Sequence, residues 1–144
     1  GLGGMGEAVF GPARFIWIFL LAVLGGALMA QMLGGLLSFG ASGGLFGVMG
    51  ALISFGWTRQ HLLPTKLVSV FGKQLAMWAL LNLAVGLLLP FVSNPSHVGG
   101  LLTGLAAGVV CADRLTSEVM PSEIPLGLAS LSLICISYGC LILR

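Results

Sequence analysis

The sequence predicts an all-α membrane protein, a polytopic bundle of about five spanning helices. Of its 144 residues, 58% are hydrophobic and only 7% are charged, whereas about 25% of the residues of an ordinary soluble domain are charged. Two long intervals, from Arg14 to Arg59 and from Lys73 to Asp113, contain no charged residue between their ends. Each is about twice the roughly 20 apolar residues that one spanning helix needs. Each interval should therefore hold two helices.

Helix-breaking residues divide both intervals, because clusters of Gly, Pro, Ser and Asn interrupt helical patterns. The breakers are Gly34, Gly35 and residues 38–40 in the first interval, and Pro90, Ser93, Asn94 and Pro95 in the second. A fifth apolar run extends from Pro125 to Leu143. Helices are therefore expected at about 13–33, 43–58, 74–91, 97–112 and 126–143, with Pro12 and Pro125 at or just before helix starts, where proline is tolerated.

Charge and cysteine content argue against several other classes of protein. Six Lys and Arg against four Asp and Glu give a formal charge of +2, without the clustered basic surface of a nucleic-acid-binding protein. We therefore expect no nucleic-acid partner. The three cysteines, 111, 135 and 140, lie in or at the ends of apolar runs and form no C-x-x-C pair. They are expected to be buried small hydrophobic residues, and neither a disulfide framework, a metal nor a cofactor is predicted.

Basic residues indicate the direction in which the helices cross the bilayer. The link between the second and third helices contains three basic residues and a histidine, namely Arg59, His61, Lys66 and Lys73. The links at 35–41 and 92–96 carry no charge. Because basic residues in short loops mark the cytoplasmic side, the second and fourth helices should both begin at the non-cytoplasmic face. Arg14 and Arg114 then also lie on the cytoplasmic side.

This topology brings Ser42 and His97 together, since they stand at the starts of the second and fourth helices. Both helices also carry a stripe of small residues at four-residue spacing, which places them on one helix face. The stripes are Gly43, Gly47 and Ala51 on the second helix, and Gly100, Gly104, Gly108 and Ala112 on the fourth. Such stripes let helix backbones approach closely in lipid, although they are common in any membrane bundle.

Taken singly, neither polar residue is specific. A serine at a helix start is often an N-cap, and a lone histidine near a membrane interface is more often a solvated bystander than a catalyst. Together with their glycines they form two longer motifs, Gly40-Ala41-Ser42-Gly43 and His97-Val98-Gly99-Gly100-Leu101-Leu102-Thr103-Gly104. These motifs resemble the rhomboid family of intramembrane serine proteases, whose signatures are G-x-S-G on one helix and H-x-x-G-x-x-x-G two helices later.

The resemblance runs through about Arg114 and includes Glu7, the approach to the first helix at 11–14 and Asn94. It implies a rhomboid-like transmembrane domain over 1–144, with Ser42 as nucleophile and His97 as general base cleaving transmembrane protein substrates. It also implies that Phe46, one turn beyond Ser42, packs against His97, although core packing is an equally good account of a Phe there. Asn94 and the motif glycines are expected to support the site, with Gly43 and Gly44 leaving room for substrate.

Chemistry favours a Ser-His dyad over a triad. A serine hydroxyl needs an adjacent base to remove its proton, and free N–H groups at a helix start suit a developing oxyanion. Residues 40–44 also satisfy G-x-S-x-G, but that nucleophile elbow needs a preceding strand and an acidic partner. Asp113 lies sixteen residues beyond His97, about 24 Å along a helix. It is too far away to orient the imidazole.

Two further expectations concern the extent of the chain and rival functions. The resemblance implies two preceding spanning helices, one with a His and an Asn that hold the oxyanion, so the chain, which opens at Gly1, is expected to be a truncated piece. Helix 126–143 resembles the extra C-terminal helix of some rhomboids. One rival is a noncatalytic rhomboid-like protein that binds transmembrane clients. Another is a channel or transporter fragment, which the absence of intramembrane charges disfavours.

Overall fold

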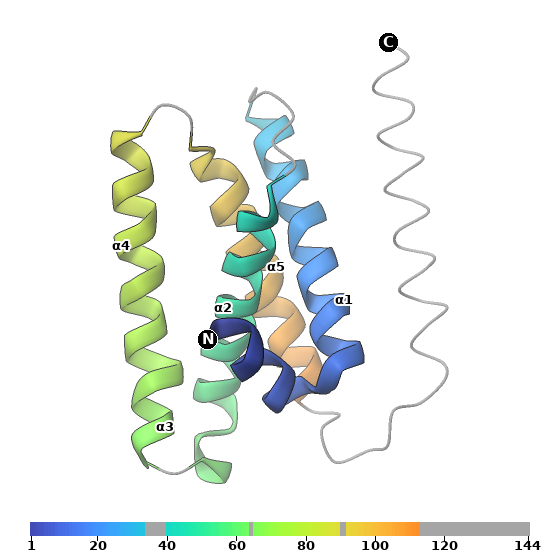
Figure 1. The fold of residues 1–144 in the computed structure, drawn as a ribbon, viewed down its shortest axis with the longest axis vertical. Coiled ribbons are helices and arrows are strands. Elements are labelled where there is room, and N and C mark those ends of the chain that lie inside the picture. The colour runs from blue at the N-terminus through green and yellow to red at the C-terminus, as the bar shows by residue number, and fades with distance from the viewer. Residues whose placement is uncertain (34–39, 64, 90–91, 113–144) are drawn as a thin grey trace. The chain divides into compact units, whose positions relative to one another are not determined.

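The computed structural model describes residues 1–33, 40–63, 65–89 and 92–112, all of which lie in the first of two compact units, 1–113. The elements in chain order are α1 (Leu2–Met32), α2 (Ala41–Thr58), a 3₁₀ turn (Gln60–Leu62), α3 (Thr65–Ser69), a π-helical turn (Val70–Gln74), α4 (Leu75–Leu88) and α5 (Asn94–Ala112). Figure 1 shows their arrangement. The described residues contain no strand, which confirms the all-α class. The helix expected at 126–143 lies outside these residues.

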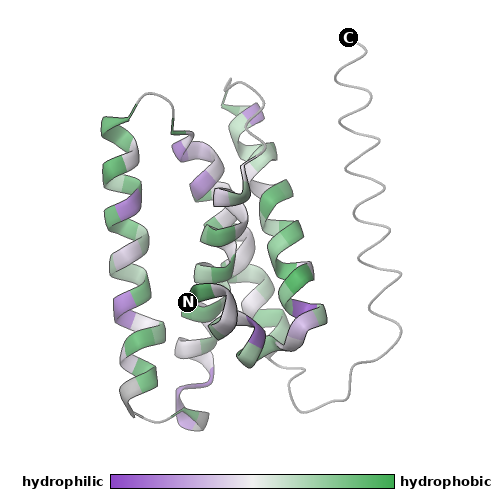
Figure 2. Ribbon diagram, viewed as in Figure 1, coloured by the Kyte–Doolittle hydropathy of each residue, from purple (hydrophilic) through white to green (hydrophobic). Residues whose placement is uncertain are grey.

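Helices α1, α2 and α5 form the centre of the bundle, and α4 lies to one side of it (Figure 1). α2 is buried along nearly its whole length from Gly43 to Gly56, so it is the central helix. α4 is the opposite case, since only Leu75, Ala79 and Gly86 are buried along it. Figure 2 shows that α4 is hydrophobic over most of its length, as a lipid-facing helix should be.

The two stripes of small residues meet face to face. A Cβ placed on Gly100 would overlap the carbonyl oxygen of Gly43, and one placed on Gly104 would overlap that of Gly47. A Cβ on Gly108 would lie 2.6 Å from the Cα of Ala51. The contacts advance by four residues on both helices, so α2 and α5 run parallel and in register with their backbones touching. This register fixes the relative depth of the two helix starts.

The first helix differs from the prediction at its N-terminal end. The helix was expected from residue 13, but Leu2 to Phe10 is already helical. Gly11, with φ 78° and ψ 162°, breaks the axis before Pro12. The left-handed φ requires glycine, and the proline then starts the longer segment. Arg14, near the predicted start of this helix, is a buried residue of it.

The third predicted helix also begins earlier than expected. The helix was expected from residue 74, with Lys73 in the preceding link, but a π-helical turn at Val70–Gln74 carries the chain from α3 into α4 without a break. The described part of this helix ends at Leu88. Cys111 near the end of α5 is half-buried instead of fully buried. The other two cysteines lie outside the described residues.

Three helices of the described part are long and apolar enough to cross a membrane, at Leu2–Met32, Ala41–Thr58 and Leu67–Leu88. α5 (Asn94–Ala112) is not among these three. Its length of 19 residues nevertheless approaches the roughly 20 that a span needs. The protein is thus a multi-pass membrane protein, and the number of five spans stays a prediction.

The close backbone packing makes a mutational prediction for Gly104. Gly104→Val adds a branched side chain where even a Cβ overlaps Gly47, and overpacking of this kind costs about 1–3 kcal/mol or more. Ala106→Val adds a similar volume at an exposed position of the same helix and should cost little. Denaturation in detergent micelles, followed by helical circular dichroism, measures both. Equal stability of the two variants would contradict the packing described here.

Candidate active site

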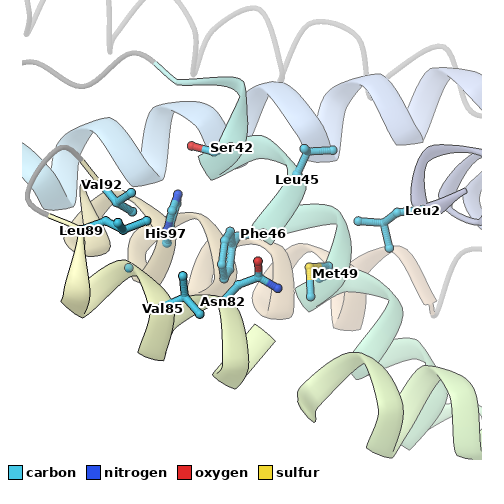
Figure 3. Close-up of a pocket in the computed structure, with 11 residues that line it drawn as sticks. Leu2, Ser42, Leu45, Phe46, Met49, Asn82, Val85, Leu89, Val92 and His97 are labelled. Atoms are coloured by element: carbon cyan, nitrogen blue, oxygen red, sulfur yellow. The ribbon is translucent and has the colours of Figure 1, made fainter. Parts of the chain in front are cut away.

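Ser42 and His97 line the same cavity, which has a volume of about 360 Å³ and lies between α2, α4 and the start of α5. The other residues that line it are Leu2, Leu45, Phe46, Met49, Asn82, Val85, Gly86, Leu89 and Val92. Figure 3 shows Ser42 and His97 toward one end of the cavity and Leu2 and Met49 toward the other. The cavity wall is therefore largely apolar, and its few polar groups are Ser42, His97 and Asn82.

Ser42 is an exposed residue in the first turn of α2. The helix begins at Ala41, two residues earlier than predicted, and Gly40 precedes it with extended backbone angles of φ −105° and ψ 134°. The N–H of Gly43 donates to the carbonyl of Gly40 at 3.2 Å. The first four N–H groups of a helix have no partner further back in the helix. Those near Ser42 are suited to a negatively charged oxygen at this helix end.

His97 lies in the first turn of α5, which begins at Asn94 instead of at His97 as predicted. Pro95 follows the first helical residue, where its missing N–H costs nothing. The N–H of His97 donates to the carbonyl of Ser93 at 3.2 Å, and only 9% of the residue is exposed. The imidazole ring is thus held inside the bundle at the edge of the cavity.

The ring of Phe46 stacks on the imidazole of His97, with ring centroids 4.3 Å apart and an angle of 13° between the planes. This is the contact that the family resemblance implied. Phe46 is itself buried and belongs to a small core with Met49 and Ala79. This core holds the Phe46 ring in place, and the ring in turn packs against one face of the imidazole.

No carboxylate orients the imidazole among the described residues. Of the four acidic residues, only Glu7 is described, and it is exposed. The Nδ1 atom of His97 is buried and has no hydrogen bond partner there. Stacking is therefore the described interaction that orients the ring, an arrangement that fits a dyad. Asp113 itself lies outside the described residues.

The glycines within α2 and α5 lie against neighbouring helices, and Ser96 packs beside one of them. Ser96 is 2% exposed, and a Cβ on Gly43 would lie 3.2 Å from its Oγ. A Cβ on Gly44 would meet the ring of Phe19 at 2.6 Å. Gly43 and Gly44 thus face α5 and α1, so the expectation that they leave room for substrate is wrong. Gly40 and the two α5 glycines of the motif, Gly100 and Gly104, are also not among the residues that line the cavity.

Asn94 does not share the cavity with the predicted dyad. Its Nδ2 donates to the carbonyl of Leu83 at 3.2 Å, joining the start of α5 to α4. Its side chain also lines a second, apolar cavity between these two helices. Asn94 is therefore placed to tie α4 to α5.

Sequence reasoning missed Asn82, the one additional polar residue of the cavity. A signal was available, because Asn82 is the only amide side chain in the α4 segment LAMWALLNLAVGLL. The apolar lining from Leu2, Val85 and Leu89 had no such signal, since Leu and Val are the commonest residues of any membrane helix. Only the packing of the helices decides which of them face the site.

Comparisons with known proteins agree with the motifs. A family model described as the rhomboid domain matches residues 2–114. RHOMBOID-like protein 6, mitochondrial, of Arabidopsis thaliana is 38% identical over 105 residues, covering 72% of this chain and 33% of that protein. RHOMBOID-like protein 5 of the same plant is 36% identical over 125 residues, covering 84% and 40%.

A bacterial relative carries an activity in its name. Rhomboid protease GluP of Bacillus subtilis (strain 168) is 29% identical over 101 residues, covering 70% of this chain and 19% of that protein. The chain thus spans at most 40% of the length of these three relatives. No solved structure matches the chain. Because the family match covers most of its length, including both helices that line the cavity with Ser42 and His97, the chain belongs to the rhomboid family of multi-pass membrane proteins.

Proposed function

We propose that the protein is an intramembrane serine endopeptidase that cleaves transmembrane segments of other proteins through a dyad of Ser42 and His97. The observation that supports this most strongly is their position in one apolar cavity of a membrane bundle. Ser42 offers an exposed hydroxyl at a helix start, and His97 is held by its stack on Phe46. A relative with the same domain is named a rhomboid protease.

The chemistry proceeds in two steps. In the first, His97 removes the hydroxyl proton as Ser42 Oγ attacks the peptide carbonyl, and the same proton then passes to the leaving amine as the C–N bond breaks. In the second, a water molecule gives up a proton to His97 and attacks the acyl ester, which releases the new carboxyl terminus and restores Ser42. Backbone N–H groups in the first turn of α2 stabilise the oxyanion of each tetrahedral intermediate.

The active site faces the non-cytoplasmic side in this proposal. Ser42 and His97 belong to the first turns of α2 and α5, whereas Arg59 and the helix-linking segment that follows it come at the far end of α2. Basic residues at that end indicate the cytoplasmic side. A substrate is therefore cut near the non-cytoplasmic end of its membrane segment.

Replacement of either dyad residue tests the function. Ser42→Ala and His97→Ala, made in the full-length gene product and reconstituted in liposomes with a single-span reporter, should each lower cleavage by at least about 1,000-fold, because the two groups act as a unit. Release of the soluble product, followed on gels, measures this. Wild-type levels of cleavage by Ser42→Ala would refute the mechanism.

The rival function makes a different prediction in the same assay. A noncatalytic protein that binds transmembrane clients would leave the reporter intact while it is retained with the protein after detergent extraction. That retention would persist in Ser42→Ala. An uncut, retained reporter beside well-folded wild-type protein would replace the protease proposal with the client-binding one.

The stack on His97 predicts a specific role for Phe46. Phe46→Leu removes the ring that fixes the imidazole, and since aromatic pairs are worth about 0.5–1.5 kcal/mol, kcat should fall by about two- to tenfold. Phe55→Leu is the matched control, because Phe55 is a buried aromatic of the same helix that packs on Phe10 and Phe71 away from the cavity. Comparable losses of kcat in both variants would show that Phe46 acts only as core.

A further inference from the structure

Asn82 is a polar residue in a place that the dyad mechanism does not use. It is the only amide side chain of α4 and its only side chain with an oxygen acceptor for hydrogen bonds, and it lines the same cavity as Ser42 and His97. In the bilayer a polar group without a partner is costly. An amide at this point of an apolar helix is therefore expected to have a binding partner.

The hydrogen bonding of Asn82 fixes which of its atoms faces the cavity. Its Nδ2 donates to the carbonyl of Trp78, one turn earlier in α4, at 2.7 Å. A carbonyl oxygen accepts and cannot donate, so the nitrogen must lie on that side. The Oδ1 atom is then turned away from the helix backbone, and it has no hydrogen bond partner among the described residues. Figure 3 shows the amide beside Phe46 and Met49.

The depth of Asn82 follows from its neighbours. Ala79, three residues before it, packs in one cluster with Phe46 and Met49, which places Asn82 at about the level of Phe46. Phe46 lies four residues beyond Ser42 on α2, which corresponds to about 6 Å along the helix axis. The free acceptor thus lies about one helical turn deeper in the bilayer than the nucleophile.

We propose that Asn82 Oδ1 is a subsite for a hydrogen bond donor, a hydroxyl or an amide N–H, on the side chain of the substrate's transmembrane segment. This inference rests on the proposed protease function. An offset of about 6 Å corresponds to about two residues of extended chain or four residues of helix. The preferred polar residue therefore lies two to four positions from the cleaved bond, toward the bilayer centre.

The chemistry of the cavity explains why such a subsite discriminates. The surrounding wall is apolar, with Phe46, Met49 and Val85 next to Asn82 in the lining. Asn82 is exposed when the cavity is empty. A bound substrate with an apolar residue at this position covers the Asn82 oxygen without a partner, whereas a Ser or Thr residue satisfies it. A site built to bind a hydrogen-bonding group rejects the analogue that lacks this group more strongly than an apolar pocket rejects an extra methyl group.

The test uses two reporters that differ by one isosteric residue, Thr or Val, scanned over the second to fourth positions from the cleaved bond. The full-length gene product in liposomes should cleave the best Thr reporter about five- to tenfold faster in kcat/KM than its Val partner. Asn82→Leu should bring this ratio to about one. Because the ratio is taken within each variant, a smaller amount of folded protein does not change it. If Asn82→Leu does not accumulate, Asn82→Ala gives the same comparison.

A composition-matched control moves the amide instead of deleting it. The double variant Asn82→Leu with Leu81→Asn keeps one Asn in α4 but turns it about 100° around the helix, away from the cavity, and should also show a ratio of about one. A ratio that stays the same in Asn82→Leu, or a wild-type ratio near one at all three positions, would overturn the subsite while Ser42-dependent cleavage continued. Absence of any Ser42-dependent cleavage would instead overturn the protease function and the subsite with it.

Discussion

The site depends on one constraint, the direct contact between the backbones of α2 and α5. Gly100 and Gly104 lie against the carbonyl oxygens of Gly43 and Gly47 with no room for a side chain between them. In lipid this close packing replaces the hydrophobic effect as the main source of helix association. It also sets the register of two parallel helices, and with it the depth at which each helix begins. Ser42 and His97 line one cavity because the glycine contacts set the register of α2 against α5.

The remaining parts of the site are built around that contact. Ser96 fills the space beside Gly43 at the start of α5, and Phe46, one turn after Ser42, stacks on the imidazole. α4 closes the side of the cavity with Asn82, Val85 and Gly86, yet most of its surface is exposed. The bundle therefore combines a tightly packed pair of helices, which position the reactive groups, with a peripheral helix that has few buried residues and completes the cavity wall.

Much of this arrangement could be predicted from the sequence, because the signals were local and chemical. Two uncharged intervals defined the helices, glycine spacing paired α2 with α5, and the motifs around Ser42 and His97 indicated the family. The predictions that were wrong concern features that depend on how the helices pack, which local sequence does not encode. Lys73 was placed in a link between helices but belongs to a π turn that continues the helix. Gly44 was expected to leave room for substrate but faces the ring of Phe19. Asn82 became meaningful only when its helix was placed beside the cavity.

The central claim, that the helix register makes Ser42 reactive through His97, is tested most directly by covalent labelling. A fluorophosphonate probe reacts with a serine only when its hydroxyl is activated by a neighbouring base, and it needs no knowledge of the substrate. With the full-length gene product in membranes, mass spectrometry should find the label on Ser42, and His97→Ala should abolish it although Ser42 stays exposed. Equal labelling of Ser42 in His97→Ala, or no label on Ser42 in well-folded wild-type protein, would contradict the account.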